Sequence, residues 1–69
     1  MAATDTQIGG SHYDMPIQPV EFIYRNNIPF CEANVIKYVC RWRKKNGIED
    51  INKAIHYLEL LKQLEFGES

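Results

Sequence analysis

The side chains best suited to hold a ligand recur along one face of the middle of the chain. At about 100° per residue, a helix here aligns an amide, two ammonium groups, a phenol and a guanidinium, which are Asn34, Lys37, Tyr38, Arg41 and Lys45. Lysine and arginine neutralise phosphate, the amide can bind polar ring edges, and the phenol offers a stacking or hydroxyl contact. This polar row suits an anion that carries a flat ring. It also fits the solvated side of an amphipathic helix, which needs no ligand.

The distribution of charge has the same two interpretations. Five of the eight lysines and arginines fall within residues 37–45, although the formal net charge of the chain is −1. A basic block in a nearly neutral protein indicates either an anionic partner or a helix end that complements its own dipole.

Familiar catalytic patterns are missing from the sequence. There is no G-x-x-x-x-G-K-[ST] phosphate loop, and no serine or cysteine has an obvious neighbouring base. Glu49 and Asp50 are adjacent and do not converge on one helix face, so they predict no magnesium site. The cysteines and histidines lack the paired spacing of zinc ligands; they are Cys31, Cys40, His12 and His56. We therefore expect binding, with no catalytic residue, metal or cofactor.

Length and composition predict one small folded domain. With 69 residues, 45% apolar and 25% charged, the chain is typical of a globular protein and too short for a large enzyme scaffold. No apolar run is long enough to span a bilayer, so no membrane partner is expected. Two cysteines without a secretory leader favour a reducing cytosol and two buried thiols. Because a core this small supplies only about 3–5 kcal/mol, we expect a partner subunit.

Three helices must position the polar row, so the predicted fold class is all-α. The expected segments are a flexible arm over residues 1–11 and, in a single domain over 12–66, helices over about 19–26, 31–45 and 49–65. Pro19 fits the first turn of a helix, and Asn26 and Asn27 tolerate the left-handed geometry that ends one. Gly47 is suited to end the second helix.

Helical periodicity also predicts which faces are buried. The second helix is expected to turn one apolar face to the core, formed by Val35, Ile36, Val39, Cys40 and Trp42. The first helix is expected to do so with Val20, Phe22, Ile23 and Tyr24. Glu21 and Arg25, spaced i,i+4, are expected to pair outside.

The third helix has an apolar sector too wide for two neighbours to cover. It spans about 220° and comprises Ile51, Ala54, Ile55, Tyr57, Leu58, Leu60, Leu61 and Leu64. Uncovered apolar surface marks interfaces, so we predict a homo-oligomer. Lys53 lies inside this sector beside Tyr57, unlike an ordinary surface lysine. His56 lies among polar residues and is expected to be exposed.

The sequence resembles a small domain family of tailed phages whose function is unknown. The resemblance covers about residues 12–61 and is carried by the order of His12-Tyr13, Ile17-Gln18-Pro19, Asn34-x-x-Lys37-Tyr38 with Arg41, Lys44-Lys45, Gly47-x-x-Asp50 and Lys53-Ala54-x-x-Tyr57-Leu58. The family is related to part of a coliphage deoxynucleoside monophosphate kinase that lacks a P-loop. The resemblance thus implies a protein that handles nucleotides in the host cytoplasm during infection.

The resemblance adds motif positions to the polar row, among them Asp50. The candidate nucleotide-binding residues are then His12, Tyr13, Asn34, Lys37, Tyr38, Arg41, Lys45, Lys53 and Tyr57. Small phage proteins that sequester the cyclic nucleotide signals of bacterial immunity provide a precedent for binding without catalysis. A two-fold pair of second helices would present the row twice, matching a ligand with two phosphates and two bases.

Three functions remain open at this stage. The first is an anti-defence sponge that holds a cyclic nucleotide between subunits, and it is favoured because the additional length of the kinase relative is missing here. The second is a nucleoside monophosphate kinase. The third is a small DNA-binding protein, since the last two helices are joined by a short turn. In that case the recognition helix would carry few side chains that read bases, so nucleic acid is not an expected partner.

Overall fold

A computed structural model describes residues 15–67 of the chain. The described part contains helices α1 (Pro19–Arg25), α2 (Phe30–Arg41) and α3 (Ile48–Phe66), with a short 3-10 helix, η2 (Trp42–Lys44), after α2. The three α-helices and the absence of strands from this part of the chain confirm the predicted all-α fold. The arm expected over residues 1–11 lies outside the described residues, as do the candidate site residues His12 and Tyr13.

The turn between α1 and α2 forms where the asparagines predict it. The Asn26 side chain donates a hydrogen bond to the Phe22 carbonyl at 2.9 Å, and the Ile28 amide donates to the Ile23 carbonyl at 3.0 Å. Asn27 has a φ of 53°, in the left-handed region that asparagine tolerates better than most residues. Together these groups end α1 and reverse the chain.

The second helix ends earlier than the sequence predicts. Its α-helical part stops at Arg41, and residues 42–44 continue as the tighter η2. The Gly47 amide donates to the Trp42 carbonyl at 2.9 Å, and Gly47 has a φ of 54°, which glycine adopts without the steric cost of a side chain. This turn brings α3 back alongside α2.

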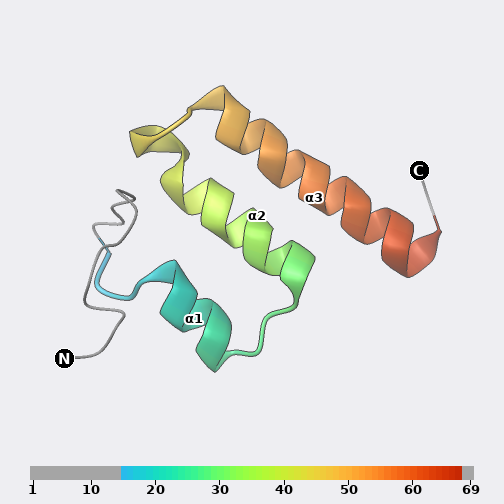
Figure 1. The fold of residues 1–69 in the computed structure, drawn as a ribbon, viewed down its shortest axis with the longest axis horizontal. Helices are drawn as coiled ribbons and strands as arrows, with labels where there is room; N and C mark the ends of the chain where they lie inside the picture. Colours follow the sequence, from blue (N-terminus) through green and yellow to red (C-terminus); the bar gives the residue numbers. More distant parts are fainter. Residues whose placement is uncertain (1–14, 68–69) are drawn as a thin grey trace.

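The three helices lie in one layer, with α2 between α1 and α3 (Figure 1). The molecule measures 17 Å along its shortest axis, against 27 and 43 Å along the other two. Each helix therefore packs along its sides only. No other helix of the described part covers the two broad faces of the layer.

Burial is correspondingly sparse, and several predicted core positions are wrong. Only Cys31, Ala54, Pro19 and Asp50 are buried within the described residues. Val39 is 50% exposed and Cys40 is exposed, because their side of α2 faces out of the layer. On α1, which packs mainly against α2, the expected core residues Val20, Phe22 and Tyr24 are also exposed. The Glu21–Arg25 pair forms as predicted, at 3.0 Å.

Candidate functional site

Side chains from α2 and α3 meet around the ring of Tyr38. The Tyr57 ring stacks on Tyr38, with ring centroids 6.0 Å apart and an angle of 15° between the planes. The cationic groups of Lys37 and Arg41 each lie 4.7 Å from the centroid of the Tyr38 ring, and Lys53 Nζ lies 5.3 Å from it. We call these five residues the Tyr38 cluster. They are all candidate site residues of the sequence analysis, now brought together.

Helix geometry explains why these residues meet. Lys53 and Tyr57 are four residues apart on α3. On α2, Lys37 and Tyr38 lie four and three residues before Arg41, so each set occupies one side of its helix. Phe30, the first residue of α2, adds a third ring to this contact. Its ring meets Tyr57 edge-on, with centroids 5.9 Å apart and an angle of 69° between the planes. The contact between α2 and α3 is thus partly aromatic and partly cationic.

Arg41 is held in place by a buried carboxylate. Its Nε and Nη2 each donate a hydrogen bond of 3.2 Å to Asp50, on Oδ2 and Oδ1 respectively. The Arg41 side chain is 19% exposed and that of Asp50 is 0% exposed. Asp50 Oδ2 also accepts a hydrogen bond of 3.2 Å from the Asn46 amide. This bidentate ion pair joins the end of α2 to the start of α3.

The ionisation of Asp50 follows from these partners. The hydrogen bonds from Arg41 hold the pKa of Asp50 below its ordinary value of 3.8, and the Asn46 amide acts in the same direction. Burial opposes this shift, because it disfavours the charged form. Asp50 therefore remains a carboxylate at neutral pH and balances one of the nearby positive charges.

The Tyr38 cluster keeps an excess of positive charge. Lys37, Arg41 and Lys53 carry three positive charges, and Asp50, which is paired with Arg41, contributes one negative charge. Lys53 is exposed and Lys37 is half-buried, so both ammonium groups are within reach of a ligand. Since Arg41 is engaged by Asp50, the two lysines are the groups best placed to neutralise an added anion.

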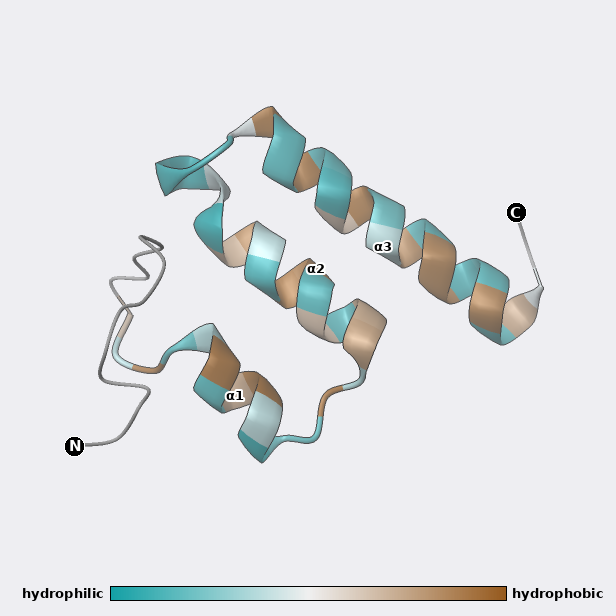
Figure 2. Ribbon diagram, viewed as in Figure 1, coloured by the Kyte–Doolittle hydropathy of each residue, from teal (hydrophilic) through white to brown (hydrophobic). Residues whose placement is uncertain are grey.

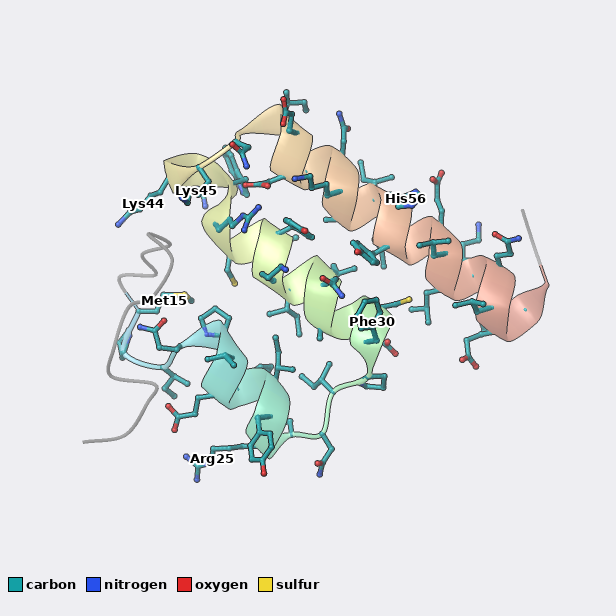
Figure 3. All side chains as sticks on the ribbon, viewed as in Figure 1. Met15, Arg25, Phe30, Lys44, Lys45 and His56 are labelled. Carbon is teal, nitrogen blue, oxygen red and sulfur yellow. The ribbon has the colours of Figure 1, made fainter. Side chains whose placement is uncertain are left out.

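The polar row is not a purely solvated helix face. Tyr38 and Arg41 pack against α3, and the Tyr57 ring stacks on Tyr38, for which the sequence predicted a stacking or hydroxyl contact with a ligand. The Asn34 side chain donates to the Phe30 carbonyl at 2.9 Å and, with Lys37, lines a cavity between α1 and α2. Lys45 lies apart from the cluster, in the exposed turn that leads into α3 (Figure 3).

Sequence reasoning missed the part that Asp50 plays. The spacing of Glu49 and Asp50 predicted no magnesium site, but it did not show that Asp50 would be the buried partner of Arg41. The available signal was the Gly47-x-x-Asp50 motif, which places Asp50 in the first turn of α3, directly after the exposed turn. His56 is exposed as predicted, and Arg43 lies over the Trp42 ring at 4.4 Å.

Among residues 15–67, no three His, Cys, Asp or Glu side chains gather closely enough to hold a metal ion. Within the same range, every helix is too short or too polar to cross a membrane.

Fold and site together define a small all-α domain whose single helical layer carries a cationic aromatic cluster. The chain belongs to the DUF3310 family, described as a protein of unknown function, whose model matches residues 8–59. This confirms the predicted membership of a small domain family without an assigned function. The phage origin and the kinase relation stay predictions. Searches of curated proteins and of solved structures each found no match to the chain.

Proposed function

We propose that the protein binds a phosphorylated nucleotide at the Tyr38 cluster and sequesters it without converting it. The observation that carries this proposal is the gathering of three cations, from Lys37, Arg41 and Lys53, within 5.3 Å of one ring centroid. The ligand class is a cyclic mono- or oligonucleotide, of the kind that signals in bacterial immunity. The protein would then be a phage accessory protein that acts in the host cytoplasm as an anti-defence sponge.

Electrostatics supports a phosphate ligand in particular. The three cations of the Tyr38 cluster exceed the single carboxylate of Asp50, so the cluster gains from an added anion, because each charge-assisted hydrogen bond to phosphate is stronger than a neutral one. Ring contacts hold the tyrosines in place before a ligand arrives, which lowers the entropy cost of binding.

Exposed apolar surface supports the sharing of one ligand between two copies of the chain. Apolar residues recur along α3 and on α1 (Figure 2). Large apolar side chains are exposed on every helix: Val20, Phe22 and Tyr24 on α1, Phe30 and Val39 on α2, and Ile48, Ile55, Leu58, Leu64 and Phe66 on α3. A single helical layer cannot cover them by itself. A second copy would do so, and would bring a second Tyr38 cluster to a ligand with two phosphates.

Recovery of the ligand tests sequestration against catalysis. Purified protein is mixed with cyclic dinucleotides or with deoxynucleoside monophosphates, ATP and magnesium, then heated, and the nucleotides are separated by chromatography. We expect the bound nucleotide to return chemically intact and in proportion to the protein. Sustained conversion of a monophosphate would instead assign a nucleoside monophosphate kinase.

The same samples address the remaining alternative. If no nucleotide is retained, the proposal is wrong and the basic block over residues 37–45 becomes a candidate DNA contact. Binding to duplex DNA would then weaken steeply as salt is raised, because counterions are released.

A further inference from the structure

A cavity of about 240 Å³ lies between α1 and α2, next to the Tyr38 cluster. Its apolar lining comes from Pro19, Val20, Ile23 and Ala33, and its polar lining includes Asn34 and Lys37. Pockets for whole drug-sized ligands measure about 300–1,000 Å³, so this cavity suits one ring system better than a complete nucleotide.

Lys37 connects the cavity to the Tyr38 cluster. It lines the cavity, and its Nζ lies 4.7 Å from the centroid of the Tyr38 ring. Lys37 is thus shared between an apolar pocket formed with α1 and a cationic aromatic cluster formed with α3. A molecule that joins an anion to a flat ring can satisfy both at once.

We infer that the cavity between α1 and α2 holds the base of the nucleotide, while the phosphate is bound by Lys37 and Lys53. This inference rests on the proposed function and adds a second subsite to it. The apolar side chains of the cavity would cover the faces of the base, whereas the Tyr38 ring is already stacked on Tyr57. The base is thereby bound on α1 and α2, and the phosphate on α2 and α3.

Asn34 gives the proposed base subsite a polar contact. Its Nδ2 donates to the Phe30 carbonyl at 2.9 Å, which fixes the orientation of the amide and leaves Oδ1 as an acceptor. An N–H on the edge of a base can donate to this oxygen. The sequence also predicted that the Asn34 amide binds a polar ring edge. The proposed contact is of this kind, but it lies in the cavity and not beside Tyr38.

The charge at Lys37 favours this occupant over a purely apolar one. An apolar side chain from a second copy would fill the cavity but would leave the ammonium group without an anion. A nucleotide base brings its phosphate with it.

The test compares ligands with and without a base. The probes are the four deoxynucleoside 5′-monophosphates and 2-deoxyribose 5-phosphate, titrated into the ¹⁵N-labelled full chain and followed by NMR. We expect at least one monophosphate to bind about tenfold or more tightly than the sugar phosphate, which corresponds to about 1.4 kcal/mol. The monophosphate should shift the NMR signals of α1 and of the first half of α2, whereas the sugar phosphate should shift the signals of residues around Lys37 and Lys53.

A cavity-filling variant and a matched control complete the test. Ala33→Leu should bind monophosphates no more tightly than it binds the sugar phosphate, because leucine occupies the cavity. Val39→Leu places a leucine at an exposed position of the same helix and should keep the preference of the parent protein.

The outcomes separate the two levels of the proposal. If the parent protein binds the sugar phosphate and all four monophosphates equally well, the base subsite is wrong while phosphate binding stands. If Ala33→Leu alters the oligomeric state and keeps the preference for monophosphates, the cavity belongs to a contact between copies and the inference is also wrong. If no probe binds, the inference is wrong, and if cyclic dinucleotides do not bind either, the proposed function is wrong with it.

Discussion

Replacing Tyr57 by leucine should destabilise the domain, because this ring joins α3 to two rings of α2. It stacks on Tyr38 at 6.0 Å and meets Phe30 edge-on at 5.9 Å. Each such aromatic pair contributes about 0.5–1.5 kcal/mol beyond its area burial, so the loss of both should lower the free energy of unfolding by about 1–3 kcal/mol. For a chain of this size the corresponding fall in Tm is about 4–24 °C.

The assay is thermal and urea denaturation followed by circular dichroism at one fixed subunit concentration. Tyr57→Phe keeps both ring contacts and should behave much like the parent protein. Tyr24→Leu makes the same substitution on α1, where the ring is 81% exposed, and should change the free energy of unfolding by no more than about 0.5 kcal/mol. If Tyr57→Leu is as stable as Tyr24→Leu, the ring contacts do not hold α2 against α3 and the reasoning is wrong.

Two other predictions concern pH and assembly. Because the folded-state pKa of Asp50 is lowered, the stabilisation from its pairing with Arg41 is complete above the unfolded pKa near 3.8 and is lost as pH falls through the lower folded value. Urea denaturation between neutral and acid pH should therefore show a smaller acid-dependent loss of stability in Asp50→Asn than in the parent, and equal losses would contradict the pairing. Leu58→Glu places a charge on the exposed apolar side of α3 and should reduce the mass measured by light scattering, whereas Lys62→Glu, at an exposed polar position of α3, should not. A parent protein that is already monomeric would refute the shared site.

Local signals in the sequence were sufficient to predict the helices. Pro19, the asparagines after Arg25 and Gly47 each act through their own backbone geometry, which does not depend on the rest of the fold. The predicted boundaries therefore lie close to those of α1 and α3. The end of α2 differs because the η2 turn depends on the hydrogen bond that the Gly47 amide donates to the Trp42 carbonyl and on the position of α3.

The faces of the helices were harder to predict, because periodicity shows which residues share a side but not which neighbour covers it. Val39 and Cys40 belong to the most apolar side of α2 and are nevertheless exposed. The side that carries Tyr38 and Arg41 is more polar, yet α3 packs against it, since Tyr57 and Asp50 supply an aromatic ring and a carboxylate there. A specific polar contact across two helices is not visible in the hydropathy of either one.

The part of the candidate site that lies on single helices was predictable from the sequence. The spacing of Lys37, Tyr38 and Arg41 on one helix was sufficient to group them, and Lys53 stood out as a lysine inside an apolar sector. The pairing of Arg41 with Asp50 required the turn between α2 and α3. It also changes which variants are informative, because removing Arg41 would leave the Asp50 charge buried without its partner.

Nucleotide binding at the Tyr38 cluster is tested most directly by calorimetric titration of cyclic dinucleotides and deoxynucleoside monophosphates. The proteins to compare are the parent, Lys53→Met and Lys62→Met. Lys53 belongs to the Tyr38 cluster, whereas Lys62 is an exposed lysine farther along the same helix. A hydrogen bond to a charged group contributes about 1.5–3 kcal/mol, so Lys53→Met should bind about 10- to 150-fold more weakly than the parent. Lys62→Met should bind as the parent does. Equal affinities in all three proteins, or no binding to the parent, would contradict the assignment of the Tyr38 cluster as a nucleotide site.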